Sequence, residues 1–99
     1  MGLLSIFRRT PSDRFRRSPH VKSVAHGDKL VLMDLRGEQF YSLDGVAVRI
    51  WDHLAQPTTA ERLSGLVVAE FEVPVEVARE DVAACLDDLT RGGLVLAGR

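Results

Sequence analysis

The spacing of apolar residues changes near residue 44, and this change restricts the folds that the chain can adopt. Between residues 21 and 43, apolar side chains come in short runs of strand length, separated by turn sequences such as His26-Gly27-Asp28. From residue 47 to residue 91 they recur every three or four positions, as on one face of a helix. Strands followed by helices predict a small α+β domain.

Three strands are expected in the first part of this domain. They cover Val21–Ala25, Leu30–Leu35 and Gln39–Leu43. The turn before the last strand is expected to close a hairpin, with Gly37 at a positive φ. Since side chains alternate along a strand, Tyr41 and Leu43 should face the core, whereas Phe40 and Ser42 should face the other way.

Three helices are expected in the second part. Their apolar faces consist of Ala47, Ile50, Trp51 and Leu54, of Leu63, Leu66, Val67 and Phe71, and of Ala78, Val82, Cys85, Leu86 and Leu89. Asp44 is expected to cap the first helix, and Thr58 the second, where Glu61 reaches back to complete a capping box. The third helix is expected over Val75–Arg91, ended by Gly92-Gly93. A three-stranded antiparallel sheet followed by three helices resembles a winged helix-turn-helix.

The chain has 99 residues, which is enough for one small domain and not for two. The folded domain is expected over residues 20–99. Residues 1–19 are expected to form a basic flexible tail, because prolines interrupt this segment and its five arginines outnumber a single aspartate. Such a tail either aids solubility or steers the chain toward an acidic peptide, a partner protein or an anionic membrane surface.

The composition argues against a membrane-inserted or secreted protein. The mean hydropathy is zero, and no apolar run approaches the ~18 residues of a spanning helix. The apolar Leu3–Phe7 segment precedes Arg8 and Arg9, which is the reverse of the order in a secretory signal. A single cysteine, Cys85, cannot form an internal disulfide. A cytoplasmic protein is therefore expected.

The reactive residue types are too scattered to predict an active site. His20, His26 and His53 lie at no ligand spacing from one another or from Cys85, so neither a metal nor a cofactor is expected. Cys85 falls on an apolar helix stripe, where burial raises the pKa of a thiol instead of activating it. We therefore expect a protein that is not an enzyme.

A winged-helix DNA-binding protein is one alternative. In that fold a late helix enters the major groove, and cations contact the phosphates. The third expected helix has the wrong charge for this role, because Arg79 and Arg91 face five acids. The arginine-rich tail could support only weak, non-specific binding, so we expect no nucleic-acid partner.

A peptide-binding module fits the pattern better, because a strand at the edge of a sheet can accept a guest peptide as a further strand. The candidate edge runs from Glu38 to Leu43, and the third helix would form the other wall of a groove. The candidate peptide-binding residues are Glu38, Gln39, Phe40, Tyr41, Ser42, Leu43, Val82, Ala83, Leu86, Asp87 and Leu89. A vacant edge also permits self-pairing, so a monomer and a swapped dimer both stay open.

The order of several short motifs resembles the PqqD-like family. The motifs are Tyr41-Ser42-Leu43-Asp44-Gly45, Ile50-Trp51 with Leu54, Phe71-Glu72-Val73-Pro74, Asp81-Val82 with Leu86 and Leu89, and Gly93-Leu94-Val95. The resemblance covers about residues 25 to 96. One departure is Cys85, which stands where the family commonly has an aromatic residue.

This resemblance implies a recognition element for ribosomally made, post-translationally modified peptides (RiPPs). Such an element binds the leader segment of a precursor peptide and presents it to maturation enzymes. The leader would add beside Gln39–Leu43, toward Val82, Leu86, Asp87 and Leu89. The Tyr41-Ser42-Leu43-Asp44-Gly45 run and the free-standing length most resemble lasso-peptide leader-binding proteins, whose partners are a leader protease and a cyclase. The alternative is the pyrroloquinoline quinone branch, where the partner would be a radical SAM enzyme.

Overall fold

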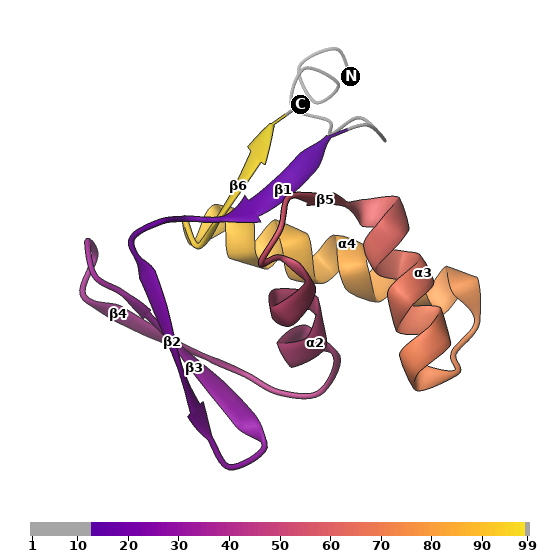
Figure 1. Cartoon of the computed structure of the whole chain (residues 1–99), viewed down its shortest axis with the longest axis horizontal. Coiled ribbons are helices and arrows are strands. Elements are labelled where there is room, and N and C mark those ends of the chain that lie inside the picture. The colour runs from indigo at the N-terminus through magenta and orange to yellow at the C-terminus, as the bar shows by residue number, and fades with distance from the viewer. Residues whose placement is uncertain (1–12, 99) are drawn as a thin grey trace.

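The computed structural model describes residues 13–98, which form two small sheets and three helices (Figure 1). The elements are β1 (Arg14–Arg17), β2 (Val21–His26), β3 (Lys29–Asp34), β4 (Gln39–Leu43), α2 (Val46–His53), β5 (Thr58–Thr59), α3 (Ala60–Phe71), α4 (Val75–Arg91) and β6 (Val95–Gly98). The expected α+β class, with a three-stranded antiparallel sheet followed by three helices, is confirmed.

Strands β2, β3 and β4 form the expected antiparallel sheet, in that order. The buried Leu32 of β3 pairs with Tyr41 of β4, and Tyr41 and Leu43 pack partly buried against the core. Phe40, on the opposite face, is 71% exposed. The predicted alternation of β4 is therefore confirmed, and it fixes which face of the sheet meets the helices.

The turn between β3 and β4 differs from the prediction. The positive φ belongs to Glu38, at 56°, and not to Gly37. Asp34 holds this turn, because its Oδ1 accepts hydrogen bonds from the backbone N–H groups of Arg36 and Gly37, at 3.0 and 3.1 Å. A Cβ on residue 37 would lie 2.8 Å from Asp34 Oδ2, so a larger residue here would displace the carboxylate that holds the turn.

Two predicted helix caps are wrong by one residue. The N-cap of α2 is Gly45, at a φ of 56°, and Asp44 contributes only its backbone carbonyl, which accepts from Ala47 N–H at 3.2 Å. The N-cap of α3 is Thr59, whose Oγ1 accepts from Arg62 N–H at 3.2 Å. Thr58 is instead buried in β5. Both helices nevertheless start within two residues of the expected place.

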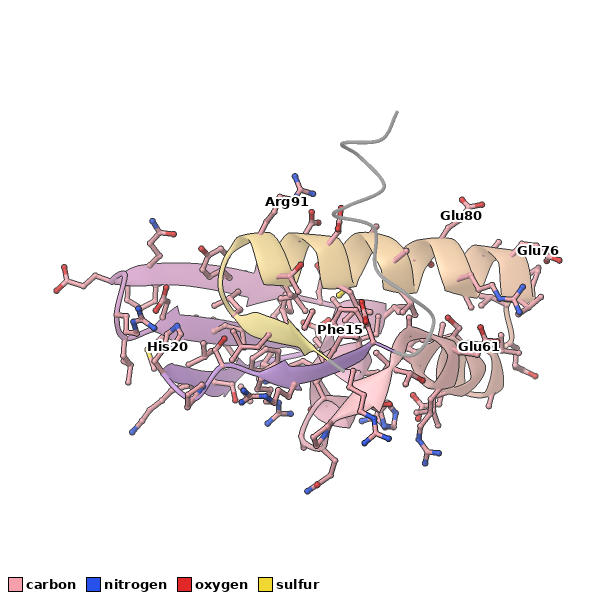
Figure 2. All side chains as sticks on the ribbon, turned by 90° about the horizontal axis from the view of Figure 1, so that it is seen from above. Phe15, His20, Glu61, Glu76, Glu80 and Arg91 are labelled. Carbon is pink, nitrogen blue, oxygen red and sulfur yellow. The ribbon has the colours of Figure 1, made fainter. Side chains whose placement is uncertain are left out.

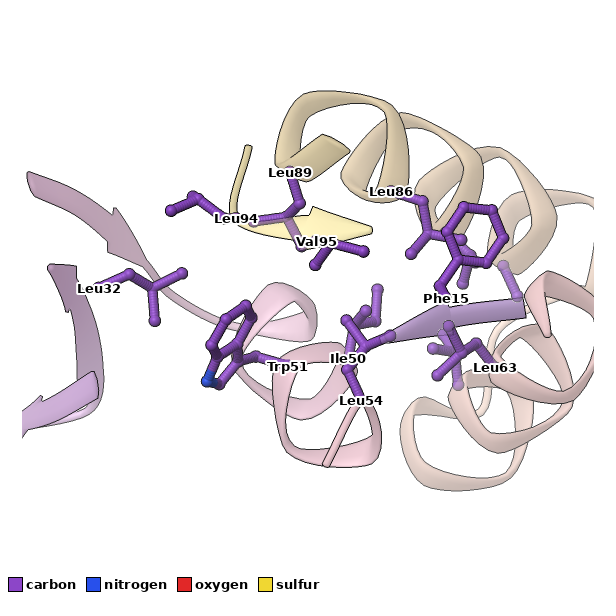
Figure 3. Close-up of a cluster of buried hydrophobic side chains, with 13 residues drawn as sticks. Phe15, Leu32, Ile50, Trp51, Leu54, Leu63, Leu86, Leu89, Leu94 and Val95 are labelled. Carbon is purple, nitrogen blue, oxygen red and sulfur yellow. The ribbon is translucent and has the colours of Figure 1, made fainter. Parts of the chain in front are cut away.

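Helix α4 covers Val75–Arg91, as predicted, and the chain turns back through Gly93 at a φ of 76°. It packs on α3 and α2 over one apolar core, which Figure 3 shows between the helices and the sheet. The buried core residues are Phe15, Leu32, Ile50, Trp51, Leu54, Leu63, Val67, Ala78, Val82, Leu86, Leu89, Leu94 and Val95.

A second sheet was not expected, and it corrects the predicted domain boundary. Strand β1 lies between β5 and β6, antiparallel to both. Phe15 of β1 is only 2% exposed and lies near Leu63 and Leu86 in the core (Figure 3). The expected tail of residues 1–19 is thus wrong from residue 14 onward, because Phe15 supplies one face of a strand. Residues 1–12 lie outside the described part of the chain.

Candidate peptide-binding site

Strand β4 lies at an edge of its sheet. Within residues 13–98, β3 is the only strand that pairs with β4. In an antiparallel pair, alternate residues direct their N–H and C=O groups away from the partner strand. The outer side of Gln39–Leu43 therefore presents a row of backbone donors and acceptors that another extended chain could complete.

The C-terminal end of α4 lies beside this sheet. Figure 2 shows Arg91 at the end of the helix near the sheet, and Glu76 and Glu80 at the far end. A Cβ added to Gly92 would lie 3.3 Å from Tyr41 Oη, so the phenol ring of β4 rests against the backbone that follows α4. The Tyr41 hydroxyl donates a hydrogen bond to Gln39 Oε1 at 2.7 Å. Tyr41 thus sets the spacing between the edge strand and the helix end.

Two contacts define which side of α4 faces β4. Arg79 donates to Glu61 of α3 at 3.2 Å, so that side of α4 faces α3. Gly92 meets Tyr41 on another side. Cys85 lies two helical turns before Gly92, so it shares the side that faces β4. Asp88, whose charge acts on the Cys85 thiol, lies on the same side. We call Tyr41, Cys85, Asp88 and Gly92 the strand–helix wall.

The five predicted helix residues lie elsewhere on α4. Val82, Leu86 and Leu89 are 0%, 1% and 4% exposed, so they belong to the core and do not form an open floor. Ala83 and Asp87 are exposed, and Asp87 pairs with Arg91 at 3.6 Å. Their helical positions place them on the solvent side of α4, away from Gly92. The part of these residues in peptide binding stays a prediction, whereas Cys85 and Asp88, at the flank of the stripe, are more accessible than the three buried residues.

The predicted strand residues lie together along the edge. Gln39, Tyr41 and Leu43 share the face toward the helices, and Phe40 and Ser42 share the outer face. Glu38 precedes the strand in the turn and is exposed. This placement gives one continuous edge of about the length that strand addition uses.

The wall has no activated nucleophile. Burial, and to a lesser extent the Asp88 charge, raises the pKa of the Cys85 thiol from 9.0 to about 11. The thiol is therefore protonated at neutral pH, and a thiol is a poor nucleophile in that form. Among residues 13–98, no group of three or more His, Cys, Asp or Glu side chains could hold a metal ion.

The other polar clusters of the described chain join elements to one another. Arg49 and His53 of α2 contact Glu70 of α3 at 3.2 and 3.1 Å, and these hydrogen bonds lower the pKa of the Glu70 carboxyl. His20 lies 3.5 Å from Asp34. No helix within residues 13–98 is long and apolar enough to cross a bilayer.

The charges of α4 also argue against the DNA-binding alternative. Arg79 pairs with Glu61, and Arg91 contacts both Asp87 and Asp88. Both cations of the helix are therefore already neutralised by carboxylates, while Glu76, Glu80 and Asp81 add further negative charge to its exposed surface. A helix with this charge repels phosphates.

The positions of residues around the axis of α4 are the signal in the sequence that could have pointed to Cys85 and Asp88. Cys85 lies at one edge of the apolar stripe of α4 with Asp88 beside it, and Arg79 lies at the other edge. Which flank faces the strand depends on how α4 crosses the sheet, and that crossing is set by tertiary packing. The sequence therefore offered two flanks without a means to choose between them.

These features define a class of small winged-helix-like recognition domains, with an open edge strand beside a C-terminal helix and with no activated nucleophile on the strand–helix wall. The family model described as coenzyme PQQ synthesis protein D (PqqD) matches residues 29–95, and the chain belongs to the PqqD family.

Two solved structures are similar to this chain. One, described as TbiB1 in complex with the TbiA(beta) leader peptide, is 28% identical, with a TM-score of 0.74 over 81% of this chain and 93% of that one. The other, a lasso peptide synthetase B1 complexed with the leader peptide, is 26% identical, with a TM-score of 0.74 over 83% of this chain and 96% of that one. No curated protein sequence matches the chain.

Proposed function

We propose that this protein is a non-catalytic recognition element that binds the leader segment of a ribosomal precursor peptide by adding it as a strand to β4. The observation that carries the proposal is the open edge at Gln39–Leu43 beside the wall of α4. Its support is the similarity to two proteins that were solved with leader peptides.

In this arrangement, the two faces of the leader meet different surroundings. Leader side chains on the inner face would point toward the side of the sheet that carries Tyr41 and toward the flank of α4 that carries Cys85 and Asp88. Those on the outer face lie beside Phe40 and Ser42, which are exposed. Main-chain hydrogen bonds supply affinity, and the inner face supplies selectivity.

The protein works with separate enzymes in this proposal. Its partners are a leader protease and a cyclase of lasso-peptide maturation in the cytoplasm, and its contribution is to raise the effective concentration of the precursor at those enzymes. The alternative assignment is pyrroloquinoline quinone biosynthesis with a radical SAM enzyme, which the name of the matching family favours. The two lasso-peptide proteins among the similar structures favour the first assignment.

Calorimetric titration of the full chain with a synthetic leader tests the proposal. The leader is taken from the precursor gene that neighbours this one. Wild type should bind with a Kd between micromolar and nanomolar, about −8 to −12 kcal/mol. Phe40→Pro, which removes an outward-facing donor from β4, should lose this affinity, whereas Ser23→Pro, which removes an outward-facing donor from the opposite edge strand β2, should keep it.

The fold of both variants is checked by circular dichroism. A folded Phe40→Pro protein with unchanged leader affinity contradicts strand addition at β4. Cleavage or modification of the leader by the isolated wild-type chain contradicts the non-catalytic role.

A further inference from the structure

The second sheet, which consists of β5, β1 and β6, carries arginines on its outer face. Phe15 of β1 is buried in the core, so the alternating residues Arg14 and Arg16 point away from the core, and both are exposed. The register pairs Arg16 with Leu96 of β6, which places Leu96 on the same outer face, where it is 37% exposed. This face therefore combines two cations with an aliphatic side chain.

A third arginine adjoins this face. Thr59 of β5 pairs with Arg14, and its Oγ1 accepts a hydrogen bond from the backbone N–H of Arg62. Pro57 is exposed, and it lines both the hollow that contains Arg14 and Arg16 and the neighbouring hollow that contains Arg62. We call Arg14, Arg16, Pro57, Arg62 and Leu96 the arginine face.

Carboxylates do not neutralise the arginine face. Within residues 13–98, its three arginines form no salt bridge. Asp52, which lines the neighbouring hollow, is paired with Arg49 at 2.8 Å. Asp13, beside Arg14 in the sequence, adds one carboxylate against three guanidinium groups. The face therefore keeps a net positive charge.

This charge is local, because the whole chain has a formal net charge of −1. Exposed acids of α4, among them Glu76 and Glu80, lie across the molecule from β1 (Figure 2). A separation of charge of this kind turns one side of a protein toward an anionic surface and keeps the other side away from it.

The sequence before β1 adds apolar residues to the arginines. The apolar Leu3–Phe7 segment is followed by Arg8 and Arg9, and Arg14 comes five residues later. Residues 1–12 lie outside the described part of the chain, but they are joined covalently to the start of β1. Apolar side chains next to arginines are typical of segments that bind at the surface of a bilayer, and a weak apolar anchor becomes stable when a basic patch adds to it.

We propose that the arginine face, together with the preceding apolar segment, binds this protein peripherally to a surface of anionic phospholipids. The three guanidinium groups pair with lipid phosphates, while Leu96 and the Leu3–Phe7 segment contact the acyl boundary. An acidic protein or a nucleic acid fits less well, because either would leave the apolar residues beside the arginines without a partner.

This inference does not depend on the proposed function. The arginine face contains no residue of β4 or α4, so it shares no residue with the leader edge or with the strand–helix wall. A chain held at a membrane by this face can therefore still take a leader on β4.

Co-sedimentation of the full chain with lipid vesicles tests the proposal. At about 0.15 M salt, wild type should bind phosphatidylcholine vesicles that contain about one-third phosphatidylglycerol at least about tenfold more tightly than pure phosphatidylcholine vesicles. The double variant Arg14→Gln, Arg16→Gln should bind the anionic vesicles about tenfold more weakly than wild type. The double variant Arg79→Gln, Arg91→Gln on α4 loses the same residue type and the same charge, so it is the matched control and should bind like wild type.

Two further variants complete the series. Circular dichroism checks the fold of each protein, and Arg62→Gln on α3 provides a second test that leaves β1 unchanged. It should weaken binding to the anionic vesicles several-fold. The double variant Ile6→Ser, Phe7→Ser should also weaken binding several-fold, because it removes apolar contacts and keeps the arginines.

Three results would overturn the membrane proposal. The first is equal binding of wild type to the two kinds of vesicle, and the second is an equal loss of binding in the two double-arginine variants. The third is that polyglutamate or a DNA duplex binds the wild-type chain under these conditions and the anionic vesicles do not. Leader affinity should stay within twofold of wild type in Arg14→Gln, Arg16→Gln, and its loss in a folded variant would assign the arginines to the leader site instead.

Discussion

The Arg17 guanidinium lies over the indole ring of Trp51, with its Cζ 4.8 Å from the ring centroid. Its Nε also donates a hydrogen bond to the backbone carbonyl of Trp51 at 3.1 Å. Burial lowers the pKa of Arg17, although nearby Asp52 opposes this effect. The pair joins β1 to α2, so the N-terminal strand and this helix form one unit.

Trp51 anchors α2 in the core and is 2% exposed. Replacing it with alanine should cost about 3–5 kcal/mol, because the cavity lies at the centre of a small domain. Chemical denaturation followed by circular dichroism measures this loss. A stable Trp51→Ala protein with an unchanged denaturation midpoint would show that the indole does not hold the helix in place.

Phe15 should matter as much as a residue of the main core, although it lies in the arginine-rich segment. Its side chain is 2% exposed, and we expect Phe15→Ala to cost about 3–5 kcal/mol. Arg16→Ala, at the exposed neighbouring position of β1, is the control and should stay within about 0.5 kcal/mol. Equal stability of the two variants in urea would contradict the place of β1 in the domain.

Cys85 should titrate as a buried thiol. Its pKa is raised from 9.0 to about 11, so the folded state favours the protonated form. The contribution to stability is therefore complete below pH 9 and is lost as the pH rises from about 9 to about 11. Wild type should lose stability relative to Cys85→Ser across this range. Chemical denaturation at several pH values measures the free energy of unfolding of both proteins. A parallel pH dependence of these two free energies would contradict the raised pKa of Cys85.

The same thiol reports on the strand–helix wall. Iodoacetamide should alkylate Cys85 slowly at pH 8, and bound leader should slow the reaction further, because the guest strand covers the side of α4 that carries it. Mass spectrometry follows the rate, with glutathione as the reactivity reference. If saturating leader leaves the alkylation rate unchanged, the leader does not lie against this side of α4.

Gly92 keeps the spacing between the end of α4 and β4. Gly92→Ala would bring a Cβ to 3.3 Å from Tyr41 Oη, so the ring must move. We expect a loss of about 1 kcal/mol in stability and a several-fold weaker leader affinity. Gly65→Ala, on the exposed side of α3 with no atom within 4 Å, is the control and should stabilise the protein by up to about 1 kcal/mol. Unchanged leader affinity in Gly92→Ala would show that the Tyr41 part of the strand–helix wall does not contact the leader.

The spacing of apolar residues was enough to predict three strands and the full length of α4, because each of these elements buries one regular face. It failed for β1, where Phe15 is a lone apolar residue among arginines, and for β5 and β6, which are short and exist only by pairing with β1. The edge position of β4 was predictable from its place as the last strand. The side of α4 that carries Cys85 and Asp88 was not, since which side lies near β4 depends on how α4 crosses the sheet.

The central claim is that a guest backbone completes the outer side of β4. A series of synthetic leaders, each with one N-methylated residue, tests it most directly, because N-methylation removes a single backbone donor and leaves the protein untouched. Calorimetry should find affinity lost at every second residue across the bound segment, since alternate N–H groups face β4. Affinity that is insensitive to N-methylation, or lost equally at consecutive positions, would contradict strand addition.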